Sequence, residues 1–301
     1  MTASRELFPD AFVGVLRRAL VLATRGGAGA ADSMRHATSR VAEVGGFAGH
    51  RGYVPGDDAR RVDWSAYARS GELVVKTFED ERGRDLTVLL DQSASMELGF
   101  RFDHSRRAAA LVSAVLAGRG DRVRLIAQNG DDLREFTYAK GRRIDELLDW
   151  LSALTVRGTD ADLVPSDLGR RARLIWISDF AEVDQLEDRL RRLGGVRRRA
   201  LAVLPRVELD REILEDGVFV LQDVETGRNT RVRADRRLRE QLRVELRRQA
   251  ARRREAFGRF GVRFLEWDPP SIPELEGRRS SAADWLGGRL VTTILRHGSA
   301  R

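Results

Sequence analysis

The chain has 301 residues, of which 42% are hydrophobic and 33% are charged, so it can bury a substantial core in one large domain or two smaller ones. It has no cysteine, which excludes disulfides, thiol chemistry and cysteine-ligated zinc. The net charge is +8, but nearly all basic residues are arginine and only 7% of residues are aromatic, so composition alone gives little support to a nucleic-acid-stacking surface.

The first segment with a clear pattern is 6–24, where apolar residues recur at helical spacing. This predicts an amphipathic helix that packs on the core. Its apolar part, Phe12 to Ala23, is short and contains Arg17 and Arg18, so we expect neither a membrane span nor a secretory signal, and hence a cytoplasmic protein. A Gly/Ala linker follows. Residues 1–32 therefore form the first predicted unit.

Residues 33–84 form the second predicted unit, an irregular region packed on the core. Charged and aromatic side chains alternate here, and Pro55-Gly56-Asp57-Asp58 is typical of a turn. A short helical segment is predicted to begin at Asp63-Trp64, and Leu73 to Phe78 is predicted to be a strand. The charges favour a network of internal Arg–carboxylate pairs over a direct binding site.

Residues 85–301 alternate buried runs with helical patterns, which predicts βαβ units. The fold class is therefore α/β, a Rossmann-like, mostly parallel sheet with helices on both faces. A late β-hairpin insertion is predicted near 218–233. The predicted strands are 86–90, 123–128, 133–138, 174–178, 200–204 and 261–267, and the predicted helices are 102–118, 144–154, 163–169, 182–193, 235–260 and 284–295.

A set of oxygen-bearing side chains follows two of these strands. The apolar run 86–90 ends at Asp91, and Ser93 and Ser95 follow at alternate positions. Thr159 lies in a Gly-containing loop, and Asp179 ends a later buried strand. Because ligands bind at the carboxyl edge of such sheets, we expect these five residues to converge there. Hydroxyl and carboxylate oxygens suit Mg²⁺, with Mn²⁺ or Ca²⁺ as alternatives, and leave one position open for an acidic side chain of another protein.

Motifs of several enzyme classes are absent from the sequence. Neither Lys76 nor Lys140 follows a glycine as a phosphate-binding loop requires, and no dinucleotide-binding glycine motif follows a strand. The four histidines have no metal-ligand spacing, and no serine-hydrolase elbow surrounds Ser93 or Ser95. We therefore expect a protein that is not an enzyme, with a metal-dependent hydrolase as the weakest alternative.

Taken together, these residues resemble a von Willebrand factor A-type domain, in which Asp91, Ser93, Ser95, Thr159 and Asp179 match the metal-ion-dependent adhesion site. The block from Arg51 to Arg69 resembles the signature of bacterial domain-of-unknown-function family 58, typically encoded beside MoxR-type AAA+ ATPases. Gly46 departs from the family's usual glutamate, and the amino-terminal membrane helices of many members have no counterpart here.

The resemblance implies a non-enzymatic, Mg²⁺-dependent interaction module that acts as adaptor for a MoxR-type AAA+ ATPase in assembly, maturation or metal insertion. A client protein would supply an acidic side chain to the metal. The main alternative is nucleic-acid binding through the arginine-rich helix 235–260, although Glu240, Glu245 and Glu255 favour a solvated, paired face.

Overall fold

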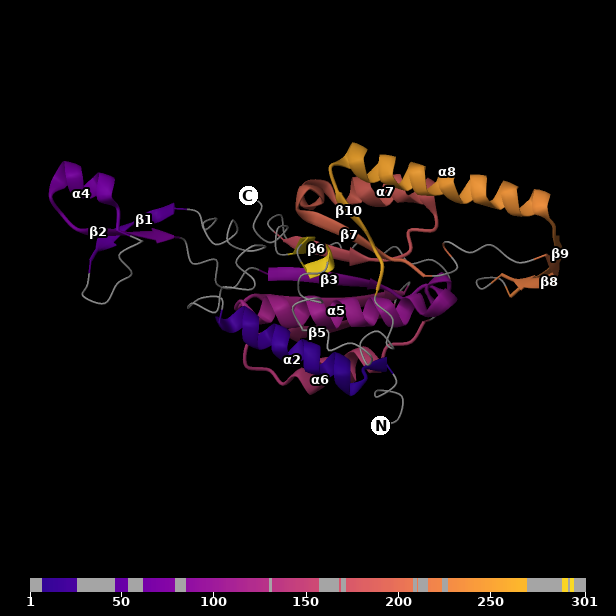
Figure 1. The fold of residues 1–301 in the computed structure, drawn as a ribbon, viewed down its shortest axis with the longest axis horizontal. Coiled ribbons are helices and arrows are strands. Elements are labelled where there is room, and N and C mark those ends of the chain that lie inside the picture. The colour runs from indigo at the N-terminus through magenta and orange to yellow at the C-terminus, as the bar shows by residue number, and fades with distance from the viewer. Residues whose placement is uncertain are drawn as a thin grey trace.

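A computed structural model describes residues 7–25, 47–53, 62–78, 85–129, 132–156, 168, 172–207, 210, 216–223, 227–269, 289–291 and 293–294. At its centre lies a six-stranded sheet in the order β10-β7-β6-β3-β4-β5 (Figure 1). All neighbouring strands are parallel except the β4–β5 hairpin. The strand bounds are β3 Asp85–Asp91, β4 Arg122–Asn129, β5 Asp132–Tyr138, β6 Arg173–Ile177, β7 Ala200–Pro205 and β10 Arg263–Trp267. The predicted α/β class with a mostly parallel, Rossmann-like sheet is confirmed.

Helices cover both faces of this sheet (Figure 1). Because side chains alternate along a strand, β3 sends Val88 and Leu90 into one core cluster and Leu89 into the other. The first cluster packs under α2 Asp10–Arg25, α5 Arg101–Gly118 and α6 Ile144–Ser152, and the second under α7 Val183–Arg192 and the end of α8 Arg236–Phe260. Every β3 side chain from Leu86 to Leu90 is therefore buried.

The predicted amino-terminal helix is confirmed as α2, and it packs closely on α5. Phe12 and Leu16 are fully buried in the first core cluster. A Cβ at Gly118 of α5 would lie 2.6 Å from the Cβ of Ala23 and 2.9 Å from the carbonyl oxygen of Leu20, so only glycine allows this approach. Among the described residues, no helix is long and apolar enough to cross a membrane.

The region predicted to be irregular contains a small antiparallel sheet of β1 Phe47–Gly52 and β2 Val74–Phe78, with α4 Trp64–Ser70 between them. Asp63 caps α4, because its Oδ1 accepts hydrogen bonds from the amides of Ser65 and Ala66, both at 3.0 Å. The helix start and β2 match the prediction, whereas β1 was not predicted. The proposed turn at 55–58 lies outside the described residues.

The late hairpin is confirmed as β8 Gly217–Gln222 and β9 Asn229–Ala234, paired antiparallel and separate from the main sheet. It leads into α8, the longest helix described. Two short 3₁₀ segments, η2 Ala94–Phe100 and η3 Gly194–Arg199, were not predicted. The predicted helix 163–169 and the predicted closing helix 284–295 lie largely outside the described residues.

Candidate metal centre

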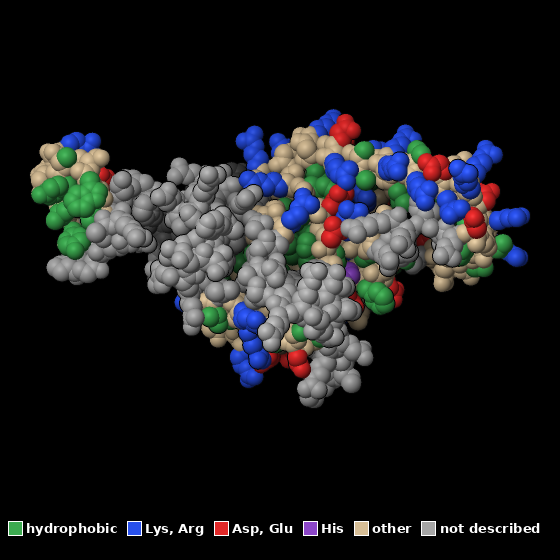
Figure 2. Space-filling model, viewed as in Figure 1, with side chains coloured by type: hydrophobic (Ala, Val, Ile, Leu, Met, Phe, Trp, Pro, Cys, Tyr) green, Lys and Arg blue, Asp and Glu red, His purple; other side chains and the backbone are tan. Residues whose placement is uncertain are grey.

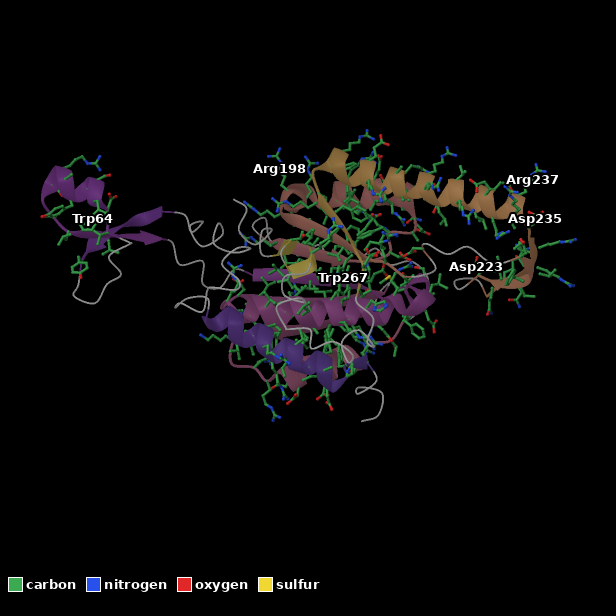
Figure 3. All side chains as sticks on the ribbon, viewed as in Figure 1. Trp64, Arg198, Asp223, Asp235, Arg237 and Trp267 are labelled. Atoms are coloured by element: carbon green, nitrogen blue, oxygen red, sulfur yellow. The ribbon has the colours of Figure 1, made fainter. Side chains whose placement is uncertain are left out.

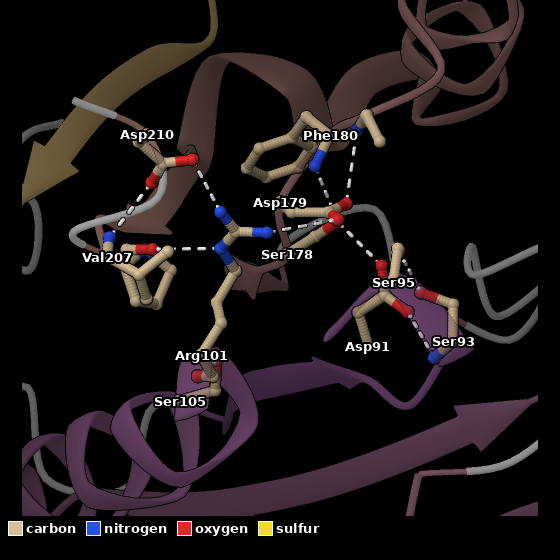
Figure 4. Close-up of polar contacts among 12 residues, drawn as sticks. Asp91, Ser93, Ser95, Arg101, Ser105, Ser178, Asp179, Phe180, Val207 and Asp210 are labelled. Atoms are coloured by element: carbon tan, nitrogen blue, oxygen red, sulfur yellow. Dashed lines mark hydrogen bonds and ion pairs between the residues drawn. The ribbon is translucent and has the colours of Figure 1, made fainter. Parts of the chain in front are cut away.

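Two neighbouring strands bring their polar ends together at the carboxyl edge of the sheet. β3 and β6 run parallel with Leu90 opposite Ile177, so Asp91 and the Ser178-Asp179 pair lie side by side. The Ser178 hydroxyl donates a 2.6 Å hydrogen bond to Asp91 Oδ2 (Figure 4). This bond joins residues 87 positions apart, and the centre is therefore a product of strand order.

The loop after β3 folds back on its own carboxylate. The Ser93 amide donates a 2.8 Å hydrogen bond to the other oxygen of Asp91, Oδ1. The hydroxyl oxygens of Ser93 and Ser95 lie 3.1 Å apart, and the carbonyl of Ser93 accepts from the Met96 amide as η2 begins. Both hydroxyls are thus placed close to the Asp91 carboxylate (Figure 4).

Asp179 is positioned by a hydrogen bond within its own turn and by the buried residue that follows it, Phe180. Its Oδ1 accepts a 3.1 Å hydrogen bond from the Ala181 amide. Phe180, between them, has a positive φ of 50°, a conformation that costs energy for a non-glycine residue. Its buried ring packs edge-on against Trp176 at 5.1 Å and Phe257 at 5.0 Å between centroids, which fixes this backbone and with it Asp179.

Arg101, the first residue of α5, lies buried against the far side of Asp179. Its guanidinium is 3.5 Å from Asp179 Oδ2 and 2.6 Å from Asp210 Oδ1, and its Nε donates to the carbonyl of Pro205. Asp210 in turn accepts from the Val207 amide at 2.9 Å. Arg101 therefore links the end of β6 to the segment that follows β7 (Figure 4).

Within the described part of the chain, no basic side chain forms an ion pair with the Asp91 carboxylate. Burial raises the pKa of Asp91, and the neighbouring negative charge of Asp179 raises it further, while the hydrogen bonds from Ser178 and Ser93 lower it. Arg101 compensates Asp179 but has no bond to Asp91. A small cation close to Asp91 would supply the missing charge, so the donor set fits a divalent ion.

The chemistry of the donors selects the kind of ion. Within the described part of the chain, no group of three or more His, Cys, Asp or Glu side chains could hold a metal. The edge instead offers the carboxylates of Asp91 and Asp179 and the hydroxyls of Ser93 and Ser95. Hard oxygen ligands of this kind suit Mg²⁺, which also keeps several waters, and do not suit zinc or copper.

Four of the five residues predicted from the sequence are thus brought together: Asp91, Ser93, Ser95 and Asp179. The fifth, Thr159, lies outside the described residues. The side-chain amide of Gln92 donates a 2.8 Å hydrogen bond to the carbonyl of Thr155, which ties the residues just after α6 to the loop after β3. Sequence reasoning missed Ser178, Arg101 and Asp210. Only Ser178, next to Asp179 at a strand end, gave a signal that could have been used.

Comparison with known proteins assigns the chain to a family. The family "Protein of unknown function DUF58" matches residues 49–256, more than half of the chain. The chain belongs to the DUF58 family. That span contains β3, β6 and all five predicted site residues.

Two similar relatives are mycobacterial proteins: "Uncharacterized protein Rv1480" of Mycobacterium tuberculosis and "Uncharacterized protein Mb1516" of Mycobacterium bovis. Each is 29% identical over an alignment of 188 residues, and the match covers 58% of this chain. The match spans 59% of the length of each relative. The likeness therefore extends over part of each protein.

The arginines of the second half of α8 are largely engaged within the fold. Arg252 pairs with Asp184, Arg254 with Glu266 at 2.6 Å, and Arg259 with Glu187 at 3.1 Å. Arg253 donates to the carbonyl of Asp179 at 3.2 Å. Since these guanidiniums already have anionic or carbonyl partners, this half of the helix is poorly suited to neutralising phosphates.

Proposed function

We propose that this protein is a non-enzymatic, Mg²⁺-dependent interaction module that serves as adaptor for a MoxR-type AAA+ ATPase in assembly, maturation or metal insertion. The observation that carries the proposal is the convergence of two carboxylates and two hydroxyls at one sheet edge, with a buried Asp91 that has no ion pair among the described residues. The ATPase partner rests on the family resemblance of the Arg51 to Arg69 block.

The roles of the chain's own residues follow from their contacts. Ser93 and Ser95 would hold the ion through neutral hydroxyls, and Asp91 and Asp179 would act mainly through water. An ion bound mainly by neutral ligands stays electrophilic and attracts a carboxylate from a client protein. No hydrogen bond among the described residues links Ser93 or Ser95 to a histidine, so neither has the partner that activates a serine nucleophile.

An exposed apolar rim next to the centre supports a docking role. Phe100, directly before Arg101, is 76% exposed, and Leu98 is 42% exposed. Phe100 also has a positive φ of 61°, so the chain holds a large apolar side chain in solvent at a cost in backbone energy. A partner that covered this rim would bury apolar surface beside the carboxylate it supplies.

The double variant Asp91→Ala/Ser93→Ala tests the proposal. We expect it to abolish the heat of Mg²⁺ binding in calorimetry and the Mg²⁺-dependent pull-down of a purified MoxR-type ATPase, with circular dichroism unchanged. Asp145→Ala/Ser152→Ala on α6 is the matched control, because it removes the same two groups away from the sheet edge and should leave both measurements unchanged.

A second variant tests the apolar rim independently of Mg²⁺ binding. Phe100→Ser should weaken the pull-down while the Mg²⁺ affinity stays the same, since Phe100 contributes no ligand. Pull-down that survives in the double variant, or that is indifferent to a chelator, would refute the adaptor proposal.

A further inference from the structure

A second exposed surface lies on β8, β9 and the first half of α8, residues 236–247, which we call the arm (Figure 1). The segment from Asp216 to Arg247 contains eight Arg and six Asp or Glu, so it carries two of the eight net positive charges of the chain. It shares no residue with the metal centre. Its function is therefore a separate question.

One face of the arm hairpin combines aliphatic and cationic side chains. Val218 pairs with Arg233 and Val220 with Arg231 across the two strands, and their side chains share one face because alternate residues point the same way. Val218 is 55% exposed and Val220 is 67% exposed, and both arginines are exposed. We call these four residues the arm face.

Four arginines of the arm have no ion-pair partner in the part of the chain that the structure describes. Among the residues that the structure describes, Arg231, Arg233, Arg236 and Arg237 form no ion pair, unlike the paired arginines farther along α8. Figure 2 shows Lys and Arg side chains gathered at this end of the molecule, and Figure 3 places Arg237 at its outer tip. The arm therefore carries four arginines without an ion pair beside exposed aliphatic side chains, whereas its Arg239 and Arg243 pair with Asp216 and Glu240.

The arm is also held in place before any partner arrives. An isolated two-stranded hairpin is only marginally stable in water, so it needs support from the rest of the fold. Arg239 of α8 pairs with Asp216 at the foot of β8 at 2.7 Å, Asp235 caps α8 through the Leu238 amide, and Ala234 is buried. A preformed surface loses little conformational entropy on binding.

From these contacts we infer that the arm face docks an extended segment of another protein that presents both acidic and aliphatic side chains on one face, at every second position. Because the side chains of an extended segment point to opposite faces in turn, this spacing sets carboxylates against Arg231 and Arg233 while aliphatic groups cover Val218 and Val220. A nucleic acid would neutralise the arginines but leave the two valines without a partner. An anionic membrane surface is disfavoured, because segments that lie on membranes commonly insert aromatic side chains and Phe219, the aromatic residue of the arm, is only partly exposed.

Fluorescence anisotropy of the full chain with defined probes tests the inference. The probe is a labelled peptide of the repeat Val-Ser-Glu-Ser, called the Val–Glu peptide, which places Val and Glu on one face. It is compared with the repeat Ser-Ser-Glu-Ser, called the Ser–Glu peptide, with the repeat Val-Ser-Lys-Ser, with a duplex DNA, and with vesicles of equal parts phosphatidylcholine and phosphatidylglycerol. We expect the Val–Glu peptide to bind most tightly. Val218→Thr/Val220→Thr and Arg231→Gln/Arg233→Gln should each weaken it by about tenfold or more, because each removes one half of the recognition.

Matched controls isolate the arm face from general charge and hydrophobicity. Arg197→Gln/Arg198→Gln removes the same charge from η3, and Val21→Thr removes an exposed valine from α2; neither should change the affinity. Equal affinity for the Ser–Glu peptide, loss of affinity in the controls, tighter binding to DNA or vesicles through the same residues, or no peptide binding would each overturn the inference. None of these measurements depends on Mg²⁺.

Discussion

The metal centre and the arm use the same residue type, arginine, in opposite ways. Arg101 is buried, and its guanidinium contacts two carboxylates and a carbonyl oxygen. Arg231 and Arg233 are exposed and form no ion pair among the described residues. The first kind of arginine is part of the fold, whereas the second is available to a partner. The net charge of the chain does not distinguish these two kinds of arginine. The position and partners of each arginine have to be known before its positive charge is assigned a role.

The largest expected effect comes from removing the buried arginine. Arg101→Met should lower the free energy of unfolding by about 3 kcal/mol, because it leaves Asp179 and Asp210 without their partner. Asp210 is partly exposed, which softens the loss. Urea denaturation measures the change, and Arg231→Met on the arm is the control, with an expected change below about 0.5 kcal/mol.

The same variant sharpens the assignment of the centre. With Arg101 gone, the positive charge next to Asp179 is lost, so added Mg²⁺ should raise the melting temperature of Arg101→Met more than that of the unaltered protein. An equal shift in both proteins would mean that Asp179 and Arg101 do not act on the ion.

A smaller loss of stability is expected at acidic pH, and it affects the domain that carries the metal centre rather than the arm. Burial and the positive charge of Arg107 lower the pKa of His104 on α5 from 6.5 to about 4, whereas the segment 216–261 has no histidine. As the pH falls, His104 is protonated in the unfolded state before it is protonated in the folded state. The folded protein therefore loses stability as the pH falls from about 6.5 toward 4. The loss has an upper bound of about 3 kcal/mol.

His104→Gln should remove this part of the acid sensitivity. The difference in unfolding free energy between the unaltered protein and the variant, measured in urea at neutral pH and near pH 4.5, isolates it from the carboxylates that titrate in both. Parallel pH profiles for the two proteins would contradict the assignment.

The smallest expected effect has the opposite sign and belongs to the arm. Arg236 and Arg237 lie in the first turn of α8, where the helix dipole and neighbouring arginines disfavour positive charge. Arg236→Gln/Arg237→Gln should therefore stabilise the protein by about 0.3–1 kcal/mol in low salt. Thermal unfolding at two salt concentrations measures the change. A loss of stability would show that these arginines have structural partners after all.

Much of the centre could be predicted because its residues follow from local pattern. A run of apolar residues that stops at Asp91 indicates a buried strand, and parallel strands bring their carboxyl ends to one edge. Ser93 and Ser95 are close in sequence to Asp91, and Asp179 ends a second such run. The strand β1 was missed because Phe47–Gly52 has two glycines and no apolar alternation.

The sequence by itself determined the α/β class, the position of β3 and the oxygen character of the candidate ligands, because strand length, strand ends and residue type are local properties. Only the tertiary structure decided that Arg101 lies between Asp179 and Asp210, since those contacts join positions 78 and 109 residues apart. It also decided that α8 is anchored at Phe257 while Val244 and Leu246 stay exposed. Periodicity marks an apolar stripe on a helix, but what covers that stripe depends on the rest of the fold.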